Sequence, residues 1–183
     1  CTQQGLIKHY EKIAGAVDIP SLLYSVPGRT GVNISPSSVE ILAEHPNIVG
    51  IKEASGDMSQ VVEIARYISD DFALYSGNDD MIVPLLSVGG VGAISTVANI
   101  IPKDTSAMIH KYLNGSVAAA KEMQLAMKPL IDAMFIEVNP IPVKAALSMM
   151  DHIPLEYRLP LCEPENLSLY EIMCQLKEYN LIK

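Results

Sequence analysis

The chain carries a lysine at a position where an amine could react. Lys52 ends the otherwise apolar run Ile48–Ile51, which is typical of a buried strand. Desolvation at the end of such a strand disfavours an ammonium ion, and a neutral lysine can attack a carbonyl to form a Schiff base. The alternative is a structural lysine paired with Glu53, although adjacent strand residues point to opposite faces. Position alone leaves both interpretations open.

A tyrosine lies near the end of the preceding predicted strand, as Lys52 does in its own strand. Tyr24 falls in the apolar run Ser21–Val26 and precedes Lys52 by 28 residues. This interval is close to the roughly 30 residues of one β/α unit in a barrel. A phenol at the same sheet edge can donate and accept a proton during imine formation. The alternative is an aromatic core residue whose hydroxyl is satisfied locally.

Three further residues follow strand ends. Arg29 lies in the loop Pro27–Gly31, where a guanidinium can hold a carboxylate through two parallel hydrogen bonds; the alternative is a solvated surface arginine. Gly77 follows the third apolar run, and a residue without a side chain there lets a substrate approach the backbone. Ile94 ends the apolar part of the fourth run. Taken by themselves, Gly77 and Ile94 are ordinary turn and core residues.

Four alternations of apolar run and helical pattern position these residues. We expect strands at 21–26, 48–53, 72–76 and 92–96, and helices at 6–17, 35–45, 58–68, 79–88 and 102–113. Apolar strands that alternate with helices are typical of a parallel sheet. No glycine-rich phosphate loop follows a strand, which favours a closed barrel over an open dinucleotide-binding sheet. Four units are about half of an eight-unit barrel of about 250 residues.

The pattern changes after residue 115. Helical runs at 118–127, 142–150 and 165–179 occur there without strands. We therefore expect the fold class α/β. Residues 1–115 would form the C-terminal half of a (β/α)8 TIM barrel, and residues 116–183 a C-terminal helical domain. The first half of the barrel is expected to precede Cys1.

Composition narrows the class of protein. The 183 residues are 49% hydrophobic with mean hydropathy +0.24, which indicates a globular chain. A net charge of −8 without a Lys/Arg cluster argues against a nucleic-acid partner. No apolar run is long enough for a membrane span, and no secretory signal is present. Three cysteines at no metal-ligand spacing indicate a reducing compartment, so we expect a cytoplasmic protein.

Four sequence blocks, taken together, resemble the dihydrodipicolinate synthase family. They occur in the family's order and spacing across essentially the whole chain: Tyr24–Gly31, Gly50–Gly56, Ser76–Asp79 and Asn139–Lys144. The resemblance implies a Schiff-base-forming lyase of the class I aldolase type. Such an enzyme condenses pyruvate with L-aspartate 4-semialdehyde in lysine (diaminopimelate) biosynthesis. The resemblance also implies a homotetramer, a dimer of dimers, without a metal or organic cofactor.

The resemblance also implies a role for each candidate residue. Lys52 would capture pyruvate, Tyr24 would shuttle protons, and Arg29 would hold the semialdehyde carboxylate. Gly77 and the backbone carbonyl of Ile94 would line the pyruvate pocket. The family's threonine pair and the tyrosine that crosses a subunit interface have no counterpart here. The chain by itself is therefore expected to be inactive.

Two other functions stay open. A sister pyruvate-dependent lyase, acting on N-acetylneuraminate or a keto-deoxy sugar acid, would share Lys52 and Tyr24 and differ at the loop of Arg29. A non-catalytic fragment of the fold would keep the four blocks and lack the proton relay. Trapping of a pyruvate adduct separates the enzymes from the fragment.

Overall fold

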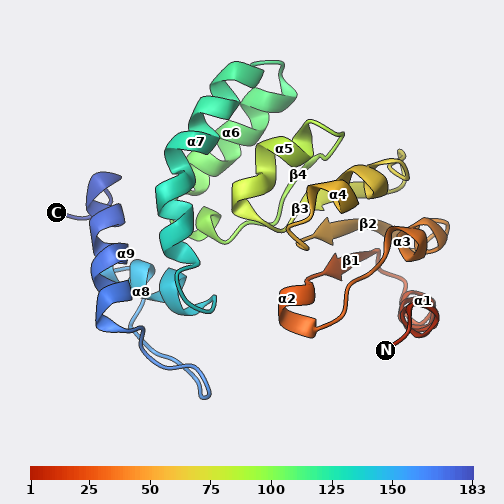
Figure 1. The fold of residues 1–183 in the computed structure, drawn as a ribbon, viewed down its shortest axis with the longest axis horizontal. Coiled ribbons are helices and arrows are strands. Elements are labelled where there is room, and N and C mark those ends of the chain that lie inside the picture. The colour runs from red at the N-terminus through yellow and green to blue at the C-terminus, as the bar shows by residue number, and fades with distance from the viewer. The chain divides into compact units, whose positions relative to one another are not determined.

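The computed structural model describes residues 1–183, and Figure 1 shows the order of its elements. The chain divides into two compact units, residues 1–94 and residues 95–183. All strands belong to the first unit, and the second is helical.

The first unit contains a four-stranded parallel sheet whose strands follow chain order. The strands are β1 (Ser21–Ser25), β2 (Ile48–Glu53), β3 (Ala73–Ser76) and β4 (Gly92–Ala93). Helices lie in every connection between consecutive strands, as Figure 1 shows. The predicted alternation of parallel strands and helices is therefore confirmed.

Capping side chains mark the beginning of three helices of this unit. The helices are α1 (Gln3–Ala14), α2 (Pro27–Thr30), α3 (Pro36–Ala43), α4 (Met58–Ala65), the 3-10 turn η1 (Asp79–Met81) and α5 (Ile82–Leu86). Before α3, the Ser35 hydroxyl accepts a hydrogen bond from the Ser38 amide, and a proline occupies the first helical turn. Before α4, the Asp57 carboxylate accepts from two amides of the first turn. These caps are those that the sequence pattern favours.

The core of the first unit lies between one face of the sheet and its helices. Its strand residues Leu23, Ile51 and Leu74 are at most 1% exposed, and they pack with side chains of α3 and α4 such as Leu42 and Ile64. Strand residues of the opposite face are much more exposed, Leu22 by 44% and Tyr24 by 43%. One face of the sheet is thus covered by helices, and the other is open along β1.

The bounds of several elements differ from the sequence expectation. The first helix ends at Ala14, where the Gly15 amide caps the last turn, so Val17 lies outside it and is exposed. The fourth strand stops at Ala93, because the Ser95 hydroxyl accepts from the Ala98 amide and starts a turn. The predicted helix over 79–88 is divided into η1 and the shorter α5.

The second unit is built from packed helices. They are the 3-10 turn η2 (Val97–Asn99), α6 (Pro102–Leu113), α7 (Val117–Met134), α8 (Ile141–Met149) and α9 (Asn166–Glu178). α6 packs on α7, and α9 packs on both α7 and α8. α7 continues through Pro129 well beyond the predicted end at 127, because Leu130, Ile131 and Met134 are buried.

The expected domain division at 115/116 stays a prediction, and the boundary between the two compact units lies elsewhere. It falls after Ile94, so that α6 belongs to the helical unit. The physical reason is that α6 buries its apolar face, including Met108, chiefly against α7. None of the helices is both long and apolar enough to cross a lipid bilayer.

Candidate active site

A phenol, an amine and a second phenol stand side by side at the carboxyl end of the sheet. Tyr24 of β1 pairs in register with Lys52 of β2, and Lys52 pairs with Tyr75 of β3. Register partners on adjacent parallel strands point to the same face of a sheet. The three side chains therefore form one row, which we call the inner row, on the face opposite the core helices.

The lysine and the first tyrosine are in contact. The Lys52 ammonium nitrogen lies 4.2 Å from the centroid of the Tyr24 ring, within the range of an attractive cation–π interaction. Lys52 is half-buried, and Tyr24 is 43% exposed. The sequence predicted both residues for one sheet edge, and the structure brings them together. An amine beside a phenol that solvent can reach can perform carbonyl addition with assisted proton transfer.

Gly77 provides the space in which the lysine side chain lies. Its amide donates to the Glu53 carbonyl at 2.7 Å, which holds the backbone after β3 against the end of β2. A Cβ atom on Gly77 would lie 2.6 Å from the Ala54 Cβ and 3.0 Å from the Lys52 Cε. Any side chain would therefore collide with the Ala54 Cβ and crowd the stem of the lysine. The predicted turn glycine is also a steric requirement of the site.

Ile94 continues the same edge beyond β4. Its amide donates to the Ser76 carbonyl at 2.9 Å, and its side chain is 42% exposed. The expected core role of its side chain is therefore wrong, because β4 ends one residue earlier and Ile94 lies at the sheet edge. Its backbone lies next to the segment Ser76–Gly77.

Arg29 lies on a single helical turn, where the sequence predicted a loop. Figure 1 shows that α2 follows β1 in the chain. Only Val26 separates the two elements, and Gly31, whose φ of 69° is left-handed, caps the end of α2. The Thr30 hydroxyl donates to the Val26 and Val32 carbonyls and closes the turn. The Arg29 side chain is exposed and makes no hydrogen bond or ion pair within the chain. Its guanidinium is available to a ligand at the carboxyl end of β1.

A second row of polar side chains points to the core side of the same strand ends. Ser25, Glu53 and Ser76 are register partners, each at most 2% exposed, and we call them the outer row. The Glu53 carboxylate accepts from the Ser55 amide at 2.7 Å and from the Gln60 side-chain amide at 3.3 Å. Glu53 therefore does not pair with Lys52. Burial raises the pKa of Glu53, and these hydrogen bonds only partly oppose it.

Sequence reasoning missed Tyr75 and the outer row. A signal was present, because the dipeptide Tyr–Ser ends both β1 and β3 and flanks the Lys52–Glu53 pair of β2. Alternation along a strand places the first residue of each pair on one face and the second on the other. Register between strands, which the sequence does not show, was needed to align the three pairs.

The fourth block of the family resemblance lies in the second unit. Lys144 of α8 donates to the Glu156 carbonyl and lies 5.1 Å from the centroid of the Tyr157 ring. The Tyr157 hydroxyl donates to the Ile141 carbonyl at 2.9 Å. These contacts attach the segment after α8 to the helix itself. No group of three or more His, Cys, Asp or Glu side chains is arranged to hold a metal ion.

Comparison with protein-family models identifies one match. The model of the dihydrodipicolinate synthetase family matches residues 1–179. The chain is 48% identical over 182 residues to the 4-hydroxy-tetrahydrodipicolinate synthase of Alkaliphilus oremlandii. It is 50% identical over 182 residues to the enzyme of the same name from Thermodesulfovibrio yellowstonii. Both alignments cover all of this chain, but only 63% and 62% of the respective relatives.

A solved structure gives the same result for the fold. The crystal structure of dihydrodipicolinate synthase from Thermotoga maritima superposes with a TM-score of 0.96 at 40% identity. The match covers all of this chain and 63% of that chain. The chain thus spans less than two thirds of the length of the relatives that it matches.

Proposed function

Because the chain belongs to the dihydrodipicolinate synthetase family, we propose that the full-length protein carrying it is a 4-hydroxy-tetrahydrodipicolinate synthase. Its substrates would be pyruvate and L-aspartate 4-semialdehyde. The observation that carries this proposal is the contact between Lys52 and Tyr24 at the carboxyl end of a parallel sheet. Relatives with that name are about half identical to the chain across its whole length, which supports the substrate choice.

In the proposed reaction, the Lys52 amine attacks the ketone carbon of pyruvate. Loss of water gives an imine, and loss of a proton from the pyruvate methyl group gives an enamine. The enamine carbon then attacks the aldehyde of the second substrate, whose carboxylate Arg29 would hold through two hydrogen bonds. The amino group of the semialdehyde then attacks the imine carbon, which closes the ring, and the Lys52 amine leaves as the carbon–nitrogen bond to the lysine breaks. No metal or organic cofactor takes part.

The other residues of the sheet edge would support this chemistry. Tyr24 lies within reach of the reacting nitrogen and would pass protons during imine formation and hydrolysis. Gly77 leaves the space around the lysine stem open, and the Ile94 carbonyl would line the same pocket. The threonine pair and the interface tyrosine of the family would come from outside these residues.

The proposed fold of the full-length protein is a (β/α)8 barrel of which these four strands are a part. The open face of β1 supports this, because Leu22 and Tyr24 would be enclosed when such a barrel closes. The placement of the chain in the C-terminal half of the barrel stays a prediction, as do the homotetramer and the cytoplasmic location. Sedimentation of the full-length protein measures the assembly.

Borohydride trapping tests the proposed function. Full-length protein incubated with pyruvate and reduced with borohydride should gain the mass of one reduced pyruvate adduct, located by peptide mapping at Lys52. Lys52→Ala should abolish the adduct, while Lys8→Ala, a change of an exposed lysine on α1, should leave it intact. Absence of an adduct in the unmodified protein would overturn the proposal. Turnover of a sugar acid instead of aspartate semialdehyde would favour the sister lyase.

A further inference from the structure

A buried polar cluster lies on the core side of the sheet, behind the candidate active site. Ser25 is 1%, Glu53 2% and Gln60 9% exposed, and Asn33 is half-buried beside them. Polar groups are costly to bury, and each needs a partner. The proposed reaction uses none of these four side chains. Their contacts therefore call for a separate explanation.

The four side chains form one continuous set of hydrogen bonds. The amides of Asn33 and Gln60 pair reciprocally: Asn33 Nδ2 donates to Gln60 Oε1 at 2.6 Å, and Gln60 Nε2 donates to Asn33 Oδ1 at 3.1 Å. Gln60 Nε2 also donates to Glu53 Oε2 at 3.3 Å. The Ser25 hydroxyl donates to Asn33 Oδ1 at 3.0 Å and accepts from the Ile34 amide. The set joins β1, the segment after α2, α4 and β2.

Glu53 determines the direction of these hydrogen bonds. An ionised carboxylate only accepts, so it requires the NH2 group of Gln60 to face it. That orientation in turn places Gln60 Oε1 opposite the NH2 group of Asn33. Asn33 Oδ1 is then left as the acceptor for Ser25. One buried carboxylate therefore selects one arrangement of both amides.

Three members of the cluster lie close in the chain to residues of the candidate site. Glu53 follows Lys52, and Ser25 follows Tyr24. Asn33 lies two residues beyond Gly31, where the helical turn that carries Arg29 ends. Gln3 of α1 secures Asn33 from the other side, because its Nε2 donates to the Asn33 carbonyl at 2.8 Å. The cluster thus holds both ends of the segment 26–32 and ties them to the end of β2.

We infer that Asn33, Gln60 and Glu53 are positioning residues that hold Arg29 at a set place relative to Lys52. The inference rests on the proposed function, and it assigns the cluster to the second substrate, the carboxylate-bearing aldehyde. Imine formation with pyruvate depends on Lys52 and its neighbours on the open face. Capture of the aldehyde depends on where the turn α2 presents its guanidinium. Loss of the cluster therefore affects the second step and spares the first.

Steady-state kinetics of the full-length protein test this inference. Asn33→Ala removes the reciprocal amide pair and should raise the KM for aspartate semialdehyde about 10-fold, because misplaced binding groups weaken substrate capture. The rate of pyruvate adduct formation and kcat should stay within about 2-fold of their original values. A merely destabilised protein would instead lose active molecules, which lowers kcat and adduct yield together.

A charge exchange provides a second, independent test. Gln60→Glu should raise the same KM, because two carboxylates would then face each other where one donor and one acceptor stand now. The double variant Glu53→Gln/Gln60→Glu restores a donor and an acceptor between positions 53 and 60 in reversed order, but not the hydrogen bond to Asn33 Oδ1. Its KM should therefore fall below that of Gln60→Glu without reaching the original value. These two variants test whether the cluster positions Arg29 even if Asn33→Ala does not fold.

Thr105→Val is the matched control. Thr105 is also buried and hydrogen-bonded, through its hydroxyl to the Ile101 carbonyl, but it lies on α6 of the second unit and has no hydrogen bond to the cluster. It should leave the KM for aspartate semialdehyde unchanged. An unchanged KM in Gln60→Glu, or a double variant no closer to the original than Gln60→Glu, would overturn the inference. If the proposed function itself were wrong, the result would differ from these outcomes, because the unmodified protein would then form no pyruvate adduct.

Discussion

The ammonium nitrogen of Lys52 lies 4.2 Å above the ring of Tyr24, its register partner on the neighbouring strand. The ring and the hydroxyl of this tyrosine have separable tasks. The ring contacts the cation, whereas only the hydroxyl can carry a proton.

Tyr24→Phe separates these two tasks. The ring contact survives, so borohydride trapping should still modify Lys52 to the same extent at long incubation. Turnover should fall about 100-fold, the usual contribution of a positioned acid–base group. Borohydride trapping after long incubation and steady-state rates measure the two quantities. An unchanged turnover would show that the hydroxyl takes no part in proton transfer.

Gly77→Ala tests the steric requirement at the lysine. The new methyl group would lie 2.6 Å from the Ala54 Cβ, so the backbone must shift, and 3.0 Å from the Lys52 Cε, so the lysine side chain must move as well. We expect a stability loss of roughly 1–3 kcal/mol, typical of overpacking, measured by urea unfolding. We also expect pyruvate trapping to slow about 10-fold, because the amine is displaced.

Gly5→Ala is the control for this glycine. Gly5 lies in the first turn of α1, where a Cβ would meet only the Thr2 hydroxyl at 3.4 Å. This change should alter stability by about 1 kcal/mol or less and leave trapping unchanged. Equal behaviour of the two variants would contradict the steric argument.

Arg29→Lys tests recognition of the second substrate. A lysine keeps the positive charge but lacks the planar fork that binds a carboxylate through two hydrogen bonds. The KM for aspartate semialdehyde should rise about 10-fold or more, while pyruvate trapping at Lys52 stays intact. Arg29→Ala should raise the KM further. A fall in trapping would instead place Arg29 at the pyruvate step.

Glu53→Gln tests the linkage of stability to pH. Burial raises the pKa of Glu53 in the folded state above its value in the unfolded chain. The folded state therefore binds the Glu53 carboxyl proton more tightly than the unfolded chain does. The stabilisation that results is complete below the unfolded-state pKa of Glu53 and is lost as pH rises through its folded-state pKa. Glu53→Gln removes this titration. Urea unfolding from pH 4 to 8 should show a smaller decline of stability with rising pH in the variant than in the original.

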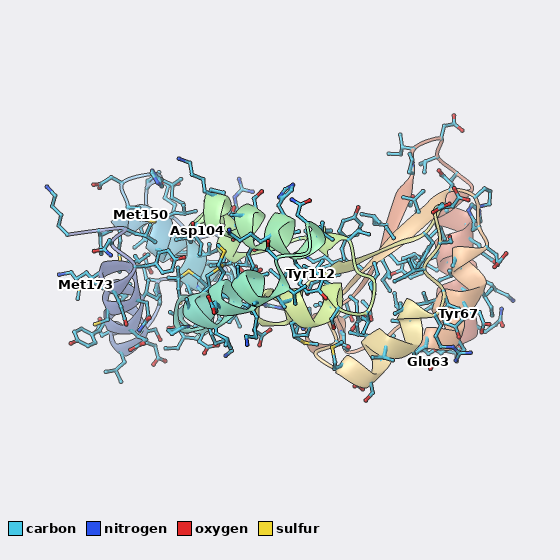
Figure 2. All side chains as sticks on the ribbon, turned by 90° about the horizontal axis from the view of Figure 1, so that it is seen from above. Glu63, Tyr67, Asp104, Tyr112, Met150 and Met173 are labelled. Carbon is cyan, nitrogen blue, oxygen red and sulfur yellow. The ribbon has the colours of Figure 1, made fainter.

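Tyr179→Phe tests a contact within the helical unit. The Tyr179 hydroxyl, at the end of α9, donates to Asp104 of α6 at 2.8 Å; Asp104 is labelled in Figure 2. Burial and this hydrogen bond to the carboxylate raise the pKa of Tyr179 to about 12. The variant should lose about 1 kcal/mol near neutral pH, the usual net value for a partly solvated hydrogen bond.

The same contact has a defined pH dependence. The folded-state pKa of Tyr179 is raised above the ordinary tyrosine value of about 10. The stabilisation by its hydrogen bond to Asp104 is therefore complete below about pH 10. It is lost as pH rises through about 12. The stability difference between the original and Tyr179→Phe should therefore shrink above pH 10. A difference that stays constant across this range would contradict the assigned hydrogen bond.

Local sequence patterns were sufficient to predict the strands and the Lys52–Tyr24 pair. The run Ile48–Glu53 is β2 to the residue, because apolar residues bounded by turn residues define a buried strand. The helix after Ser35 begins where its capping serine and proline predict. Equal spacing of β/α units then places Tyr24 and Lys52 at one sheet edge.

Long-range contacts could not be predicted in this way. Asn33 and Gln60 are 27 residues apart and pair only because α4 packs beside the segment after α2. Side-chain pairing across such an interval leaves no periodic signal in the sequence. The extent of β4 was predicted wrongly for a similar reason. The strand ends at Ala93 and not at residue 96, because the hydrogen bond from the Ala98 amide to the Ser95 hydroxyl starts a turn over the three residues that were expected to be strand.

The inner row, Tyr24, Lys52 and Tyr75, and the outer row, Ser25, Glu53 and Ser76, differ by a single step along each strand. A one-residue slip of β2 against its neighbours would turn the amine toward the helices and present a carboxylate to solvent. In a chain with this wrong register, the lysine would be inaccessible to a substrate, and its ammonium group would be buried in the apolar core. The pairing of β2 in its correct register is therefore the same folding step that exposes the reactive lysine.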